Sequence, residues 1–474
     1  MGSTNDQLIK SNLIKGNYLI SVENLNKTLP PEKQEEIRDR LVGDIYREAG
    51  IIAGECIISS GKESPLEERL DDILTSRWLG FPIMLLLLGF IFWITIVGAN
   101  MPSELLAAAL FWLEEKISIL FFRLGSPVWL HGILVHGIYR TMAWVISVMF
   151  PPMAIFFPLF TLLEDLGYLP RVAFNLDNLF KRAGSHGKQA LTMSMGFGCN
   201  AAGVISARII DSPREKLIAI ITNNFVPCNG RFPILIILSS IFMKSSLNAT
   251  YNSLLAAAVV VAFVLIGIII TLLVSWGLSR TILRGIPSTF TLELPPYRKP
   301  QIGRILVRSF LDRTLFVLGR AVMVAAPAGA VIWLLANTGV NGNSLIQYLA
   351  AFLDPFARLI GLDGFILLAF ILALPANEIV IPILVMGYLS AGIMIEPESL
   401  ETLQTILANN GWTWLTAMAT ILFALLHFPC GTTLLTIRKE TGGFKWALFT
   451  FFLTTGIAVF INLILVQFIN FFIL

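Results

Sequence analysis

Three cysteines of this chain lie where long apolar segments are interrupted. Cys228 and Cys430 each follow a proline, and Cys199 closes the phrase Gly-Phe-Gly-Cys-Asn. Proline removes a helical hydrogen bond, and broken backbone at membrane depth is tolerated only where it is buried in protein or lines a wet cavity. Because thiolates favour softer transition metals, the pattern predicts a route for a metal ion. The alternative is that each cysteine is a small apolar residue that lets helices pack closely.

A lone carboxylate is the second chemical signal. Glu378 is the only charged residue between Gly364 and Ile395, and burying it costs about 2.5 to 3.5 kcal/mol on insertion scales. We therefore interpret it as a functional ligand; a hydrogen bond to a broken helix end is the structural alternative. Further candidates for the lining of the route are the amides and the imidazole of Asn200, Asn223, Asn377 and His427, whose ordinary role is hydrogen bonding between helices.

The composition indicates a polytopic membrane protein. The 474 residues are 55% hydrophobic and 14% charged, with a mean hydropathy of +0.76, whereas soluble domains carry about 25% charged residues. A net charge of +3 argues against nucleic acid as a partner, and four dispersed cysteines do not form a disulfide framework. Walker, zinc-protease and nucleophile-elbow patterns are absent from the sequence, so we expect a transporter rather than an enzyme.

The polar and apolar segments divide the chain into two parts. Residues 1–77 are expected to form a cytoplasmic helical region and linker, because no signal peptide opens the chain. Residues 78–474 are expected to form an all-α transmembrane core with about 8 to 10 hydrophobic crossings. Within it, residues 104–123 are predicted to form an interfacial helix, and Pro151-Pro152 is predicted to break a spanning helix.

The core is expected to contain two gate-type repeats, at approximately 130–280 and 315–474. In each, a phrase of small and polar residues, at 196–200 and at 374–378, precedes a Pro-Cys break. Paired interrupted segments in matching positions are the best sequence indication of a transporter's binding site. We therefore expect interrupted helices, some of which could be re-entrant.

Basic residues predict the orientation in a cytoplasmic membrane. The connections at 280–313 and 438–445 are rich in Arg and Lys and are expected on the cytoplasmic side, whereas residues 396–410 contain neither and are expected outside. The lipid bilayer is thus the first expected partner.

Several phrases resemble the ferrous iron transport protein B family. They lie at residues 163–171, 196–200, 293–298, 429–430 and 438–442, in the family's order. The resemblance covers the chain from about residue 66 to its end. It implies a membrane core with two gate repeats, uptake of Fe²⁺ across the cytoplasmic membrane, and a route at the positions of Cys199, Cys228, Cys430 and Glu378.

Departures from the family pattern are also visible. The family usually begins with GTP-binding and regulatory domains, but only about 75 residues precede the membrane here. The resemblance therefore implies either that a separate small GTPase or another cytoplasmic regulator is a partner, or that the nucleotide control is lost. A homo-oligomer is a further expectation. The cargo would be Fe²⁺ or another divalent metal, with no covalently bound cofactor. Pro227 stands where the family usually has serine, Ala201-Ala202 where it has Val-Pro, and Asn377 where it has lysine.

Two other functions are compatible with the sequence. Gate-type repeats also occur in transporters of nucleosides or other organic solutes, which would need a pocket of polar and aromatic groups but no cysteine. A membrane scaffold that docks a soluble partner through residues 1–77 is the other alternative.

Overall fold

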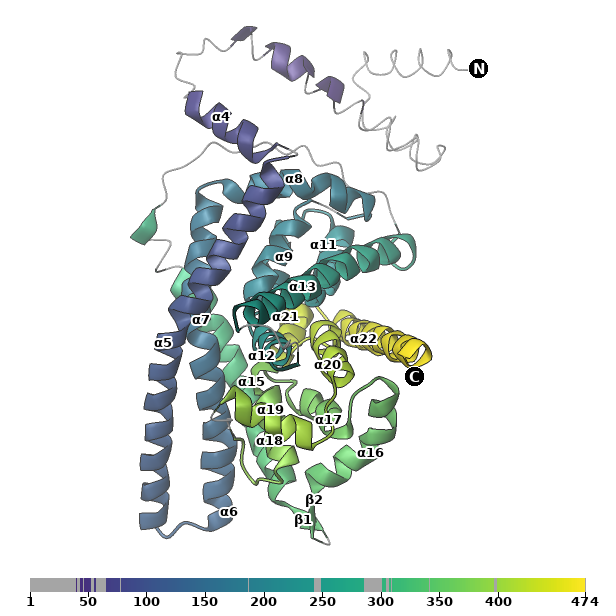
Figure 1. The fold of residues 1–474 in the computed structure, drawn as a ribbon. Helices are drawn as coiled ribbons and strands as arrows, with labels where there is room; N and C mark the ends of the chain where they lie inside the picture. Colours follow the sequence, from purple (N-terminus) through teal and green to yellow (C-terminus); the bar gives the residue numbers. More distant parts are fainter. Residues whose placement is uncertain are drawn as a thin grey trace.

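The computed structural model describes residues 65–473 except 77, 186, 243–248, 285–300, 304–306, 308, 341 and 396–398, together with parts of 40–56. The phrase at 293–298 lies outside the described residues. The described chain is almost entirely helical, with one two-stranded ribbon of β1 (Gly339–Val340) and β2 (Asn343–Ser344). Figure 1 shows the arrangement of the helices.

A long antiparallel hairpin opens the membrane core. Helix α4 (Pro65–Leu74) leads into α5 (Gly80–Arg123), which is followed by α6 (Val128–His131), the π-helical η1 (Gly132–Tyr139) and α7 (Arg140–Asp165). Figure 1 shows α5 and α7 side by side along one flank of the molecule, and they share many contacts.

Two sequence expectations about this hairpin are wrong. Residues 104–123 are not a separate interfacial helix, because they continue the 44-residue α5. Pro151-Pro152 does not end a helix either, because α7 continues through both prolines and through Pro158. An internal proline costs about 3 kcal/mol, and the packing of α7 against α5 and α15 (Phe316–Asn337) offsets this cost.

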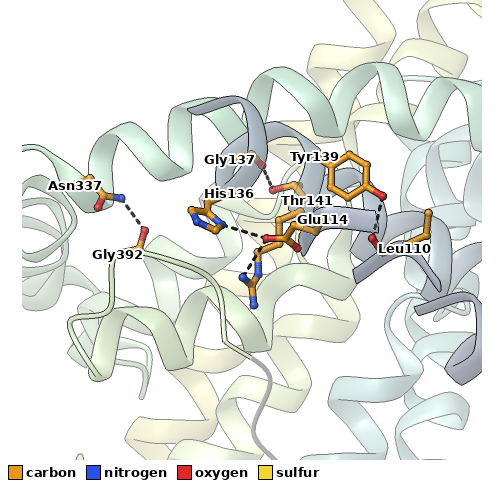
Figure 2. A network of polar contacts seen from close by, with 9 residues as sticks. Leu110, Glu114, His136, Gly137, Tyr139, Thr141, Asn337 and Gly392 are labelled. Carbon is orange, nitrogen blue, oxygen red and sulfur yellow. Dashed lines mark hydrogen bonds and ion pairs between the residues drawn. The ribbon is translucent and has the colours of Figure 1, made fainter. Parts of the chain in front are cut away.

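A buried carboxylate joins the two arms of the hairpin. Glu114 of α5 is 6% exposed, and its Oε1 lies 3.1 Å from Nδ1 of His136 and 3.3 Å from NH1 of Arg140. The hydroxyl of Tyr139 donates to the carbonyl of Leu110 at 2.9 Å. Figure 2 shows this network, whose residues come from α5, η1 and the start of α7.

The first repeat is built from short helices and one long helix. After α8 (Tyr168–Arg182), its elements are α9 (Gln189–Gly198), α10 (Asn200–Ser206), η2 (Ala207–Ile209), α11 (Pro213–Thr222), η3 (Asn223–Phe225), α12 (Phe232–Phe242) and α13 (Ala249–Arg280). Ser212 caps α11 by accepting from the backbone N–H of Glu215, and Pro213 takes the first helical position, where its missing N–H has no cost.

The second repeat has the same kind of organisation. It comprises η4 (Ser309–Leu315), α15, α16 (Leu345–Leu359), α17 (Gly364–Leu372), η5 (Asn377–Ile379), α18 (Val380–Tyr388), α19 (Leu400–Asn409), α20 (Trp414–Leu426), α21 (Gly431–Thr441) and α22 (Phe444–Ile473). Asp363 caps α17 through the N–H of Ile366, and Thr413 caps α20 through the N–H of Thr416.

The backbone supports the repeat at its interruptions. Cys199 lies between α9 and α10 with φ −156° and ψ 125°. Ala376, which precedes Asn377 of η5, has φ −155° and ψ 123°. At both interruptions, one residue in the same extended conformation is followed by an asparagine that begins the next helix.

Six helical spans in the described chain are long and apolar enough to cross a membrane, and a seventh is possible if α16 and α17, bent by 109°, act as one. Other segments that are expected to cross are divided by their breaks. Residues 189–207 and 217–242 form helices of only 7 to 11 residues, apart from their 3₁₀ turns. Helix α12 and the segment Asn377–Tyr388 are shorter apolar helices.

Candidate functional site

The first interruption places Cys199 inside the protein. Cys199 is 6% exposed. Its backbone N–H donates to the carbonyl of Met195 at 3.1 Å, and its carbonyl accepts from the N–H of Gly203 at 3.0 Å. A Cβ on the preceding Gly198 would lie 2.3 Å from the ring of Phe156. Glycine is therefore required there, because α9 ends directly against α7.

The first Pro-Cys break lies against this interruption. Cys228 is 8% exposed, in a non-helical stretch between η3 and α12. The N–H of the next residue, Asn229, approaches the carbonyl of Gly198 at 3.4 Å. This contact ties the two breaks of the first repeat together.

The second repeat brings its two breaks together in the same way. The N–H of Gly431, directly after Cys430, donates to the carbonyl of Leu374 at 2.6 Å. Leu374 precedes the interruption from which Glu378 extends. Cys430 is partly exposed, and its sulfur lies 3.2 Å from the hydroxyl of Thr433.

The breaks of both repeats border one small cavity. Its volume is about 30 Å³, enough for a water molecule, since a cavity needs about 10–15 Å³ to hold one. The cavity is lined by Met149, Met153, Gly198, Cys199, Asn200, Cys228, Asn229, Gly230, Pro375, Ala376, Asn377, Glu378, Cys430 and Thr432. All four predicted metal-route residues, and the amides Asn200 and Asn377, are in this lining.

Glu378 reaches from the second repeat onto the backbone of the first. A Cβ on Gly230 would lie 2.2 Å from Oε1 of Glu378. The absence of a side chain at Gly230 therefore makes room for the carboxylate. Among the described residues, no group of three or more His, Cys, Asp and Glu side chains is arranged to hold a metal ion, so the donors border the cavity without forming a ready coordination shell.

Asn223 and His427 are not in the lining of this cavity. The amide of Asn223 donates to the carbonyl of Asn200 at 3.1 Å. His427 is 1% exposed; its Nδ1 lies 2.9 Å from the carbonyl of Ala424, and its Nε2 lies 3.3 Å from the side-chain amide of Asn377. Both ring nitrogens are engaged, so this geometry favours hydrogen bonding between helices for both residues.

A fully buried cation, Arg231, connects the two repeats. Its NH1 donates to the carbonyls of Asn224 at 2.6 Å and Leu425 at 2.8 Å. Its NH2 donates to those of His427 at 3.1 Å and Phe428 at 3.2 Å. The position of Arg231 just after the first Pro-Cys break predicts pairing with a helix C-terminus or an acid, and the end of α20 is the partner. These carbonyls are consequently occupied by Arg231.

Sequence reasoning missed two sulfur atoms of the lining. Met149 and Met153 line the cavity from α7, which belongs to neither Pro-Cys break. Their spacing of four residues across Pro151-Pro152 places them on one helical face. The spacing of the two methionines could have indicated a shared face, but the helix was expected to break at the prolines between them.

Paired interrupted helices whose breaks meet around a small polar cavity define an α-helical membrane protein of the transporter class. The Gate family, described as nucleoside recognition, matches residues 146–243 and 318–444. The family described as ferrous iron transport protein B C terminus matches residues 260–312. The chain belongs to the FeoB family and carries its membrane core.

Individual relatives support this membership. The chain is 28% identical over 391 residues to the Fe(2+) transporter FeoB of Staphylococcus aureus (strain COL), covering 80% of this chain and 55% of the relative. It is 25% identical over 432 residues to the Fe(2+) transporter FeoB of Methanocaldococcus jannaschii, covering 88% and 61%. The chain thus spans roughly half to three fifths of their length. No solved structure matches.

Proposed function

We propose that this chain conducts ferrous iron across the cytoplasmic membrane through the cavity between the two repeats. The observation that carries the proposal is the convergence of Cys199, Cys228, Cys430 and Glu378, from four separate breaks, on one space of ionic size. Thiolate, thioether and carboxylate donors together suit a divalent transition metal of intermediate softness. The relatives named as Fe(2+) transporters make Fe²⁺ the first cargo to test.

The membrane potential is a sufficient driving force for this proposal. Moving one elementary charge across 100 mV is worth about 2.3 kcal/mol, so a divalent cation is drawn into an inside-negative cell. A separate small GTPase or another cytoplasmic regulator, and assembly into a homo-oligomer, remain part of the proposal through the family relationship.

Radioactive Fe²⁺ uptake into proteoliposomes under reducing conditions tests the function. We expect potential-driven uptake by the unaltered chain and a loss of at least about tenfold in Cys199→Ser and Glu378→Gln, because each removes a donor from a site with few ligands. Cys56→Ser is the control, since Cys56 is exposed in the N-terminal region. Normal uptake by both site variants would refute the route, and absence of uptake by the unaltered chain would refute the cargo.

A nucleoside or other organic solute is less well supported by the geometry. The cavity between the repeats, at about 30 Å³, is too small for such a molecule. A neighbouring cavity of about 360 Å³ offers only Glu378 and Ser399 as ionic or hydroxyl side chains, whereas a nucleoside needs several hydrogen-bonding partners. Competition of Fe²⁺ uptake by Zn²⁺ and Mn²⁺, but not by nucleosides, is the expected result.

A further inference from the structure

A second cavity adjoins the small one. It has a volume of about 360 Å³ and lies between α7, α12, α18 and α19, and Glu378 lines both spaces. We propose that this larger cavity is the access vestibule for the metal ion, and that Glu378 is the ligand that transfers the ion from the vestibule to the thiols. The inference rests on the proposed function and adds the direction and order of ligand contacts.

Exposure orders the ligands along this path. Glu378 and Cys430 are partly accessible, whereas Cys199 and Cys228 are 6% and 8% exposed, and of these four residues Glu378 alone lines the vestibule. The carboxylate is held against Gly230, at the backbone of the first break. An ion in the vestibule therefore meets the carboxylate before it can meet either buried thiol.

The walls of the vestibule leave Glu378 as the dominant ligand. They are formed mainly by apolar side chains, among them Trp144, Ile237, Pro382 and Leu403, with Ser399 as the other hydroxyl or ionic group. Attraction between a cation and a carboxylate is stronger beside such low-dielectric walls than in water. The vestibule can hold a cation with part of its water shell, while the inner cavity has room for about one water-sized particle. Passage between them therefore requires the exchange of water for protein ligands.

The position of α19 indicates the side from which the ion comes. Leu400 and Leu403 of α19 line the vestibule, and α19 belongs to the 396–410 connection, which lacks Lys and Arg. The distribution of basic residues predicts that this connection faces the outside. Figure 1 shows α18 and α19 in the half of the molecule away from α4 and α8, where the chain enters the core. The vestibule is accordingly placed on the uptake side.

Substituted cysteines test the vestibule independently of transport. Ile237→Cys, in a Cys56→Ser background, introduces a thiol in the vestibule wall. Ile236→Cys is the matched control, because Ile236 is 39% exposed and is not in the lining. Intact cells are treated with a membrane-impermeant methanethiosulfonate, and labelling of each cysteine is quantified by peptide mass spectrometry, with and without Mn²⁺ as a redox-stable divalent probe.

We expect Ile237→Cys to be labelled at least tenfold faster than Ile236→Cys. Mn²⁺ should slow labelling at 237 at least threefold, and Glu378→Gln should abolish this protection. Lack of labelling at 237 from outside, or protection that persists in Glu378→Gln, would overturn the inference. If the expected labelling and protection occur but the unaltered chain takes up no Fe²⁺, the vestibule site stands and the proposed function fails.

Discussion

Gly230 determines how closely the two repeats can approach at the site. The carboxylate of Glu378, from the other half of the chain, fills the space that a side chain at position 230 would occupy. A methyl group at this position would occupy the volume of Oε1. The position of the carboxylate is thus specified by a residue that itself offers no side-chain ligand.

Gly230→Ala should lower Fe²⁺ uptake by at least about tenfold, because displacing a ligand by about 1 Å is known to cost on the order of 100-fold in precisely arranged sites. Uptake in proteoliposomes is the measurement. Gly277→Ala is the control, since a Cβ there meets nothing within 4 Å. Equal uptake by Gly230→Ala and the unaltered chain would show that the position of Glu378 does not matter.

Arg231→Met should destabilise the folded protein. Each buried carbonyl that loses its donor costs about 1 to 3 kcal/mol, and Arg231 serves several carbonyls from both repeats. Thermal unfolding in detergent is the measurement. Arg358→Met provides a comparison, because that side chain is 75% exposed. If both variants unfold at the same temperature, the buried cation is not a structural connection.

At the scale of elements, the long hairpin of α5 and α7 supports the site from outside the repeats. Helix α7 supplies Met149 and Met153 to the cavity and Trp144 and Val148 to the vestibule. It must therefore keep its register against α5. The network around Glu114 joins α5 to η1 and the start of α7, near the turn of the hairpin, and is suited to fix that register.

Glu114→Ala should lower the thermal stability of the hairpin, because it leaves the partly buried cation Arg140 without its carboxylate. Loss of a buried hydrogen-bonding partner costs about 1 to 3 kcal/mol. The adjacent Glu115→Ala is the matched control, since Glu115 is exposed. Melting curves in detergent give the comparison; an equal effect of both substitutions would argue against a role for the network.

At the scale of the whole molecule, the two repeats are also joined by an ion pair away from the cavity. Arg208, after α10, donates to both carboxylate oxygens of Glu440 at the end of α21, at 2.8 and 2.6 Å. Arg208 is 59% exposed and Glu440 is 5% exposed. The pair therefore joins α10 and its 3₁₀ turn, which follow the interruption at Cys199, to α21, which follows the second Pro-Cys break.

Arg208→Glu should destabilise the core, by about 1 kcal/mol or less because exposed pairs contribute little. The exchange Arg208→Glu with Glu440→Arg should recover most of the loss, since the opposite charges are restored. Thermal unfolding at low and high salt checks both statements, with a smaller difference expected at high salt. A double variant that is no more stable than Arg208→Glu alone would contradict this pairing.

The sequence predicted the helical membrane class, the repeat and the residues at the breaks because these are local signals. Cys199, Cys228, Cys430 and Glu378 are polar or reactive residues beside helix-breaking neighbours in apolar surroundings. Other features depend on pairing between distant segments. The acceptors of Arg231 in the second repeat lie about 200 positions away along the chain. The continuity of α7 through Pro151-Pro152 depends on its neighbours rather than on its own residues.

The matched interruptions at Cys199 and Ala376 carry different chemistry on the same backbone. The first has a thiol where the second has a methyl group, and Glu378 of the second occupies the position of Ala201 in the first. In the lining of the small cavity, two of the three cysteine sulfurs therefore come from the first repeat, and the one carboxylate comes from the second. An ion that passes from the vestibule would exchange a hard oxygen partner for soft sulfur partners, while the membrane potential sets its net direction.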